Sequence, residues 1–419
     1  MQDDSSIHPI QRRLGLLSVS DIPVIRQCLS QLPLQDFVVP ILDFRKQKLS
    51  TANLLKIFTT TQFLKWDSLN TIENTILSDR EYQAAFELDS ISKSQLSRRI
   101  NSLPAEIPQA LFSAVVQRIQ EHTRPIRSKS RLPLAVVDST SLRMPPLLGD
   151  WAYVTNKQNS VKVHTRLMVV GPDVAYPDKI VPSTGNVSDY QGSDFLVVEP
   201  DVLHVMDRGY VCYKRMEKWA SGNIHFVIRL ANHHFATILE ERELPADHPS
   251  ITRDAIVRLG NQPKTTMKTP LRLIEFTDTQ GRFYRLATTR LDLKAGEVME
   301  IYRSRWLIEL FFKWLKQHLK FAQLYSHQPN AVWNHIFLAL VAYGLSYLIG
   351  LESGTRRSTW EIVSLLRIYA VKPWSQLDAA LHRKPSKRSK GRQKKDPPVP
   401  REVMEVTGVC IRQPKKRNR

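Results

Sequence analysis

The chain has 419 residues, of which 42% are hydrophobic, and this composition excludes a disordered chain and a fibre. Its formal net charge of +20 points to a polyanionic partner, either nucleic acid or an anionic membrane surface. The three cysteines, Cys28, Cys212 and Cys410, are far apart and outside any CxxC pattern, which excludes a disulfide framework and a zinc finger.

Residues 1–128 are predicted to form a helical N-terminal DNA-binding domain. The segments NLLKIFTTTQFLKW and EIPQALFSAVVQRIQEH have helical apolar periodicity. Between them, ISKSQLSRRINSLP predicts a helix capped by Ser92 or Ser94, with Leu96, Ile100 and Leu103 facing inward. Its exposed side would carry Gln95, Ser97, Arg98 and Arg99. This helix is either the DNA-reading helix of a helix-turn-helix or a solvated helix face, and the pattern leaves both open.

A basic linker, Arg124–Arg131 (RPIRSKSR), is followed by β-type runs over residues 129–231. The run LPLAVVDST ends on Asp138, and DVLHVMDRGY ends on Asp207. Because ligands collect at the carboxyl ends of strands in an open α/β sheet, we expect these two acids to converge. An acid after a strand is also common as a turn or cap residue, so neither aspartate identifies a site by itself.

Residues 232–294 predict a β-rich insertion, in which DTQGR reads as a hairpin turn. Residues 295–352 return to helix. The 16-residue apolar run Ile336–Leu351 is too short to span a bilayer and predicts a buried core helix. Residues 353–419 predict a helical segment and a basic tail.

The stretch IYRSRWLIELFFKWLKQHLK, residues 301–320, predicts one mostly buried helix. Four polar residues, Tyr302, Arg305, Glu309 and Lys316, fall on one narrow stripe of it. A carboxylate is costly to bury alone, so Glu309 must face cations, polar groups or a cleft. With Asp138 and Asp207 it would complete a three-carboxylate site of hard oxygen ligands, suited to Mg²⁺ or Mn²⁺.

The spacing Y-x₂-R-x₃-E-x₆-K of this stripe resembles the signature of the DDE transposases of bacterial insertion sequences, in the group called the "insertion sequence four" family. VVDST and VMDRGY are similar to that family's two aspartate motifs, in the same order. The resemblance covers Leu132 to about Leu351, and more loosely the helical N-terminus.

The resemblance implies an α/β protein with a ribonuclease H-like mixed sheet and flanking helices, interrupted by the β-rich insertion. It implies that Asp138, Asp207 and Glu309 are catalytic and bind two Mg²⁺ ions, for which Mn²⁺ can substitute. Tyr302, Arg305 and Lys316 would hold DNA phosphates. The implied activity is cut-and-paste transposition through a hairpin intermediate, on double-stranded DNA with terminal inverted repeats and a target, by a homodimer on paired ends.

One departure concerns the insertion. Similar transposases stack an insertion-domain Trp on a flipped base, but residues 232–294 contain no Trp. Phe235, Phe276, Phe283, Tyr284 or a His would have to stack instead, and ordinary core packing is the alternative for most of them.

The tail, from His382 to Arg419, carries 14 Lys and Arg against three acids, a net +11. Its Lys, Arg, Pro and Ser content predicts a solvated or disordered arm. The polar opening MQDDSSIHPIQRR is unlike an export leader, so we expect the protein in the prokaryotic cytoplasm, associated with the nucleoid and not with a membrane. A transposase-derived DNA-binding regulator and a metal-dependent nuclease without strand transfer remain alternatives.

Overall fold

The computed structural model describes residues 21–37, 40–45, 48–128, 132–145, 149–155, 158–171, 174–261, 266–318 and 324–384. Residues 1–381 form one compact unit, and residues 382–419 are a separate one. The basic tail therefore lies almost wholly outside the described residues, as does Cys410. Cys28 and Cys212 are free thiols.

The N-terminal region is helical, as predicted. Its helices are α1 (Val24–Ser30), α2 (Pro40–Asp43), α3 (Thr51–Leu64), α4 (Leu69–Ser78), α5 (Arg80–Phe86), α6 (Lys93–Ser102) and α7 (Glu106–Ser128). Ser92 caps α6 in a capping box with Gln95, and Leu96, Ile100 and Leu103 are buried. The predicted linker at Arg124–Arg131 is wrong in part, because α7 continues as helix through Ser128.

Ten strands form a single mixed sheet across the described residues. In sheet order they run β2-β3-β1-β5-β6-β10-β9-β8-β7, with β4 pairing β3 outside this path. Their bounds are β1 (Leu134–Met144), β2 (Tyr153–Thr155), β3 (Gln158–Gly171), β4 (Val174–Thr184), β5 (Leu203–Met206), β6 (His225–Leu230), β7 (Ala236–Glu241), β8 (Ile251–Leu259), β9 (Leu271–Thr277) and β10 (Phe283–Thr288). The predicted mixed α/β class is confirmed.

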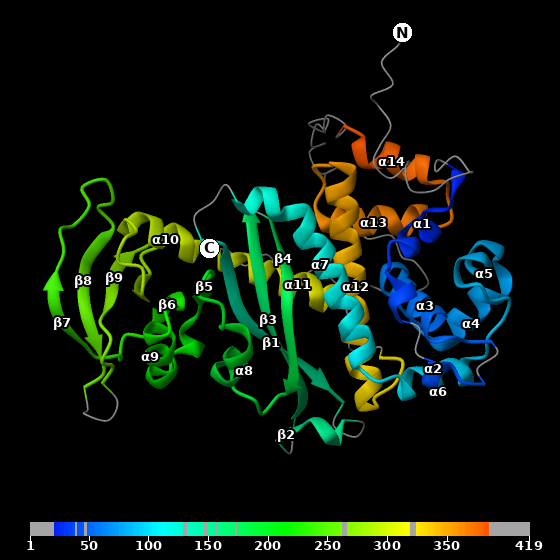
Figure 1. Ribbon diagram of the computed structural model, residues 1–419, viewed down its shortest axis with the longest axis horizontal. Coiled ribbons are helices and arrows are strands. Elements are labelled where there is room, and N and C mark those ends of the chain that lie inside the picture. The colour runs from blue at the N-terminus through cyan, green and yellow to red at the C-terminus, as the bar shows by residue number, and fades with distance from the viewer. Residues whose placement is uncertain are drawn as a thin grey trace, which may run out of the picture. The chain divides into compact units, whose positions relative to one another are not determined.

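The β-rich insertion continues this sheet, because β10 pairs antiparallel with β6. Figure 1 shows β7, β8 and β9 of the insertion side by side. The hairpin predicted at DTQGR is confirmed between β9 and β10. Asp278 N donates to Arg282 O at 3.0 Å, and Gly281 has φ +77°, a conformation that favours glycine. The four strands of the insertion, β7 to β10, therefore belong to the same sheet as the strands that carry the two aspartates.

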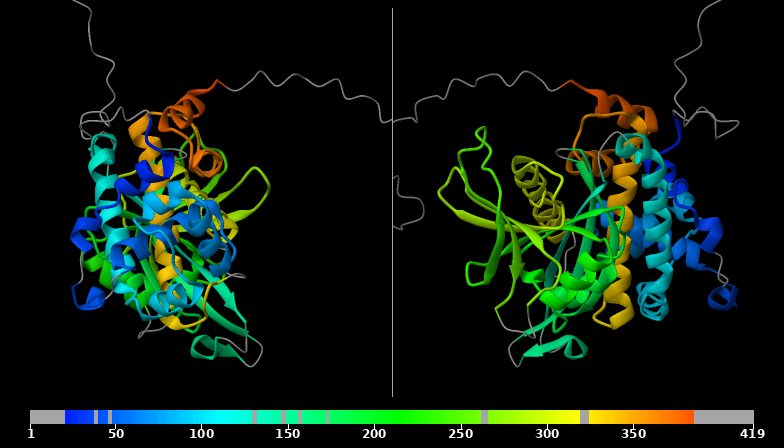
Figure 2. Two further views of the ribbon diagram at one scale, coloured as in Figure 1. Left: turned by 90° about the vertical axis from the view of Figure 1, so that its right-hand side faces the viewer. Right: turned by 60° about the vertical axis from the view of Figure 1, so that its left-hand side comes forward.

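Helices cover both faces of the sheet. On one face lie α10 (Ala295–Arg303), α11 (Trp306–His318) and α12 (Pro329–Ser353), and α12 runs side by side with α7 (Figure 2). On the other face α8 (Asp189–Leu196) and α9 (Tyr213–Ser221) enclose a second core. The remaining helices, α13 (Thr359–Tyr369) and α14 (Trp374–His382), follow α12.

The apolar run at Ile336–Leu351 lies within α12, where 83% of the most apolar window is buried inside the protein. By length and composition this is the one helix of the described chain that could cross a membrane. Gly344 brings it against α7: a Cβ at that position would lie 2.6 Å from Val115 Cγ1. The interpretation as a core helix is confirmed.

Candidate active site

Asp138 and Asp207 occupy adjacent positions on neighbouring parallel strands. Val137 of β1 is paired with Met206, the last residue of β5, and each aspartate is the next residue along its chain. Neighbouring strands are about 4.8 Å apart, and residues in the same register project to the same face. The predicted convergence of these two acids is therefore present in the sheet.

Asp138 does not end its strand, contrary to the sequence prediction. Strand β1 continues to Met144 because the long antiparallel strand β3 remains paired with it. The parallel pairing with β5 ends at Val137. Asp138 thus lies directly after the point where β5 ends and β1 loses that neighbour, next to Asp207.

The Asp138 carboxylate is destabilised in its charged form. Burial raises its pKa to about 6, and the negative charges of Asp207 and Asp189 add to this effect. The Ser139 backbone N–H, which donates to Asp138 Oδ1 at 2.8 Å, and the charge of Arg305 act in the opposite direction. A cation bound between Asp138 and Asp207 would relieve this destabilisation.

Tyr302 joins α10 to this pair of acids. Its hydroxyl donates to Asp207 Oδ1 at 3.3 Å, and its ring is buried. Burial, and then the charge of Asp207, raise the pKa of Tyr302, so the phenol keeps its proton and remains a donor.

The predicted single helix over residues 301–320 is wrong. Helix α10 ends at Arg303, Ser304 and Arg305 form a turn, and α11 begins at Trp306. Within the turn, Arg305 N donates to Tyr302 O at 3.1 Å, a bond three residues back instead of four. Most apolar side chains of α11 are buried, as predicted, but Trp306 and Leu310 are 58% and 45% exposed.

Arg305 and Glu309 form an ion pair across this break, with Nη2 and Oε1 2.5 Å apart. The Arg305 guanidinium also interacts electrostatically with Asp207 and Asp138. Arg305 therefore interacts with all three acids. Glu309 faces a cation, as its position in an apolar helix required.

The three acids do not form a ready-made metal cluster. No group of three or more His, Cys, Asp or Glu side chains is close enough to hold an ion within the part of the chain that the structure describes. Asp138 and Asp207 are neighbours, whereas Glu309 is bound to Arg305.

The remaining predicted residues lie apart from the acids. Lys316 is exposed on α11, and Arg98 is exposed on α6. The sequence predicted Arg99 on the exposed side of α6, and this prediction is wrong. Its guanidinium donates to Asp43 Oδ1 at 2.9 Å and to Leu42 O at 3.1 Å, so it ties α6 to α2.

Sequence reasoning missed a polar network behind Asp138. Ser139 projects to the opposite face of β1, where its hydroxyl donates to Asp189 Oδ1 at 2.6 Å. Lys162 Nζ donates to the same oxygen at 3.1 Å. In the sequence, Asp189 is one of several acids in this region, and nothing distinguishes it. The pairing of β1 with β3 brings Lys162 close to Ser139, and Asp189 binds both.

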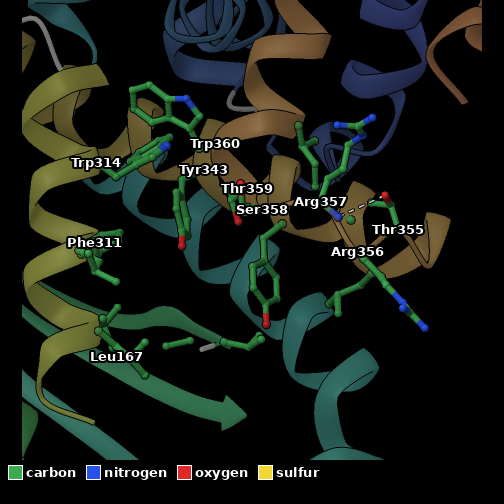
Figure 3. Close-up of a pocket in the computed structure, with 18 residues that line it drawn as sticks. Leu167, Phe311, Trp314, Tyr343, Thr355, Arg356, Arg357, Ser358, Thr359 and Trp360 are labelled. Atoms are coloured by element: carbon green, nitrogen blue, oxygen red, sulfur yellow. Dashed lines mark hydrogen bonds between the residues drawn. The ribbon is translucent and has the colours of Figure 1, made fainter. Parts of the chain in front are cut away.

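A cavity lies apart from these acids. It has a volume of about 530 Å³ and lies between α11, α12 and the segment from Thr355 to Trp360 (Figure 3). Leu307, Leu310, Phe311 and Trp314 supply the α11 side, and none of Asp138, Asp207 or Glu309 lines it. Its lining contains no carboxylate, so the acid-bearing edge of the sheet is the better candidate for a metal site.

Residues 129–345 match the family model described as "Transposase DDE domain". This segment includes β1 to β10, both aspartates and the α10–α11 turn. The chain belongs to the transposase DDE domain family. Proteins of this family use divalent metal ions.

Three bacterial relatives are similar over parts of the chain. A probable transposase for insertion sequence element IS5377 from Geobacillus stearothermophilus is 29% identical over 256 residues, 60% of this chain and 66% of the relative. The putative transposase y4zB of Sinorhizobium fredii is 29% identical over 225 residues, 53% of this chain and 62% of the relative. A putative transposase for insertion sequence element IS4SA from Synechocystis is 28% identical over 160 residues, 36% of this chain and 43% of the relative. The chain thus spans just under two thirds of the length of the first two.

Among solved structures, a piggyBac transposase synaptic complex with hairpin DNA matches 91% of this chain and 84% of that chain, at 12% identity. The TM-score of 0.42 is too low for features of that complex to be transferred.

Proposed function

We propose that the protein is a cut-and-paste DNA transposase of an insertion sequence. It binds the terminal inverted repeats of its element, cleaves phosphodiester bonds and joins the freed 3′-OH ends to target DNA. The observation that carries this proposal is the adjacency of Asp138 and Asp207 in register. Tyr302 donates to Asp207, and Arg305, which is paired with Glu309, interacts electrostatically with both aspartates.

In this proposal Asp138, Asp207 and Glu309 hold two Mg²⁺ ions, with Mn²⁺ as a substitute. The donor set fits hard divalent cations, because it consists of carboxylate oxygens without thiol or imidazole groups. Burial, and then the charges of Asp207 and Asp189, raise the pKa of Asp138 to about 6, so a bound cation would stabilise its charged form. Such ions, when bound, activate the attacking oxygen and stabilise the leaving oxygen of a phosphodiester.

Two side chains next to the acids, and the exposed Lys316 further along α11, have a separate task. Tyr302, Arg305 and Lys316 bind DNA phosphates beside the scissile bond, since a phenol can donate to a phosphate oxygen and a guanidinium can bind one with two N–H groups. Arg305 would exchange Glu309 for a phosphate when DNA and metal enter. The exposed Arg98 on α6 would contact the end DNA.

Cutting and joining two ends requires two active sites, so we propose a homodimer on paired ends. Cleavage of the second strand would proceed through a DNA hairpin. Phe276 is buried and stacked on Tyr284, with centroids 5.1 Å apart, whereas Phe235 and Phe283 are exposed and better placed to meet a flipped base. These steps would take place at the nucleoid, in the cytoplasm of a prokaryotic cell.

A metal-dependent nuclease without strand transfer, and a transposase-derived regulator without cleavage, are the competing functions. One experiment separates them. The purified protein is incubated with Mg²⁺, a target plasmid and a duplex that ends in the inverted repeats flanking its reading frame. The proposal expects nicked, hairpin and joined products, and a complex of two protomers on two ends by mass measurement. Nicking without joined product would favour the nuclease, and binding without nicking the regulator.

A further inference from the structure

Asp138 and Asp207 occupy matching positions across neighbouring strands. The residue at the matching position of β6 is Arg229. Met206 of β5 is paired with Ile228, so Arg229 neighbours Asp207 just as Asp207 neighbours Asp138. All three residues follow the last paired position of parallel strands and project to the face covered by α10 and α11. An arginine therefore lies next to the acids on the insertion side.

The Arg229 guanidinium is held in place by an aromatic stack. It lies 4.4 Å from the centroid of the Tyr284 ring on β10. Tyr284 stacks in turn on Phe276 of β9, with the ring planes 7° apart, and lies 6.3 Å from the Tyr302 ring. Stacking orients a guanidinium while leaving its N–H groups free to donate in the ring plane.

Arg229 differs from most arginines of the neighbouring insertion in its charge pairing. Five arginines of the neighbouring insertion have a carboxylate partner: Arg253, Arg272, Arg282, Arg285 and Arg290. Arg229 has no such ion pair among the described residues. Its charge does reach the catalytic edge, since it is among the cations that counteract the effect of burial on the pKa of Tyr302. An uncompensated, oriented cation beside two acids is suited to an anionic group of the substrate.

We propose that Arg229 binds a backbone phosphate of the DNA strand under attack, on the insertion side of Asp207, next to the scissile phosphate. This inference rests on the proposed function and adds a contact from β6, outside the α10–α11 segment. The planar guanidinium would donate two N–H groups to the phosphate oxygens while Tyr284 fixes its orientation. The aromatic residues of the insertion thereby gain a role in positioning Arg229 without contacting a base.

The test uses the full-length protein and a duplex carrying the terminal inverted repeat. Binding is measured as a function of salt for the wild type, Arg229→Gln and Arg282→Gln. Arg282 is the matched control, because it also lies near Tyr284, at 5.9 Å, but its charge is already paired with Asp278 at 2.7 Å. Loss of one phosphate contact should reduce the slope of log K against log salt by about 0.9 for Arg229→Gln and leave it unchanged for Arg282→Gln. Equal slopes for all three proteins would overturn the inference.

A second measurement locates the phosphate. Neutral methylphosphonates replace single phosphates around the cleavage site, and single-turnover cleavage is followed in Mg²⁺. At one position next to the scissile bond the substitution should slow the wild type and have no further effect on Arg229→Gln, because both changes remove the same contact. Arg229→Lys keeps the charge, so it should keep the salt slope while showing a smaller methylphosphonate effect than the wild type.

The two proposals fail in different ways. A wild type that binds and cuts, with Arg229→Gln as sensitive as the wild type at every methylphosphonate, contradicts the assignment of Arg229 alone. A wild type that does not cut its own ends contradicts the proposed function, and this inference with it.

Discussion

Asp138 and Asp207 are consecutive members of one cross-strand row, fixed by the pairing of Val137 with Met206. This places two carboxylates side by side, about one strand spacing apart, on the face where α10 and α11 pack. Burial and mutual repulsion raise the pKa of Asp138 to about 6. The row concentrates negative charge at the edge of the sheet, and Arg305 is the nearby cation that partly offsets it.

The ion pair between Arg305 and Glu309 predicts a competition with metal. Because the Arg305 guanidinium lies 2.5 Å from Glu309 Oε1, a metal ion must displace Arg305 before it can bind the Glu309 carboxylate. Arg305→Gln should therefore bind Mn²⁺ more tightly without DNA, by about fivefold if the pair is worth about 1 kcal/mol. Cleavage should nevertheless be slower, since a phosphate ligand is lost. Calorimetric titration with Mn²⁺ measures the affinity; weaker binding by Arg305→Gln would show that the arginine does not compete for Glu309.

Buried histidines predict acid sensitivity. Burial lowers the pKa of His204 and His335 to about 4, because the charged imidazolium is disfavoured inside the protein. An unfolded chain takes up these protons near pH 6.5. The stability contribution is therefore fully present above pH 6.5 and is lost as pH falls towards 4, by up to about 3 kcal/mol for each histidine.

Urea unfolding between pH 7 and pH 4.5 measures this loss. His335→Gln should show a flatter pH dependence than the wild type, whereas His233→Gln, at an exposed position, should follow the wild-type curve. If the free energy of unfolding depends on pH in the same way for His335→Gln and the wild type, His335 does not contribute to the acid sensitivity.

Close packing of α7 against α12 predicts an asymmetric response of two glycines. A Cβ at Gly344 would lie 2.6 Å from Val115 Cγ1, part of a stiff β-branched side chain, whereas one at Gly350 would meet only the Ile362 Cδ1 end at 2.8 Å. Gly344→Ala should destabilise the protein by about 1–3 kcal/mol, and Gly350→Ala by less. Thermal unfolding of both variants checks this order, and a more stable Gly344→Ala would refute the close contact.

The basic tail predicts a contribution to DNA affinity without sequence information. Its net charge of +11 from His382 to Arg419 can neutralise several phosphates, each adding about 0.9 to the magnitude of the salt slope. A truncation after Leu381 should weaken binding to specific and random duplexes by similar factors and flatten the slope, while cleavage at saturating protein survives. An unchanged slope would instead assign the tail to solubility.

The sequence predicted the elements of the site better than their ends. Alternating and continuous apolar runs identified the strands that carry Asp138 and Asp207, and the Ser92 cap predicted α6. The position of Asp138 within β1 was not predictable, because the strand is prolonged by pairing with β3, in which Thr165, the partner of Asp138, is 165 − 138 = 27 residues away in sequence. The same holds for Arg229, whose place beside Asp207 depends on cross-strand register.

The break between α10 and α11 was missed for a different reason. The residues from Tyr302 to Trp306 include neither Pro nor Gly, so nothing local ends the helix. The turn accompanies tertiary contacts, with Tyr302 bound to Asp207 and Arg305 to Glu309. The predicted polar stripe thus identified Tyr302, Arg305 and Glu309 as residues of the site, but it assumed one continuous helix. Lys316, the fourth residue of the stripe, is exposed and lies apart from them.

The central claim is that Asp138, Asp207 and Glu309 perform the chemistry and do not dock the DNA. It is tested most directly by single-turnover cleavage of end DNA in Mg²⁺ by Asp138→Ala, Asp207→Ala and Glu309→Ala, with Asp201→Ala, an exposed acid outside the site, as control. Each of the three variants should lose more than about 10³-fold in rate, equivalent to about 4 kcal/mol of transition-state stabilisation, while binding end DNA like the wild type. A variant among them that cuts at the wild-type rate would contradict the assignment of that residue.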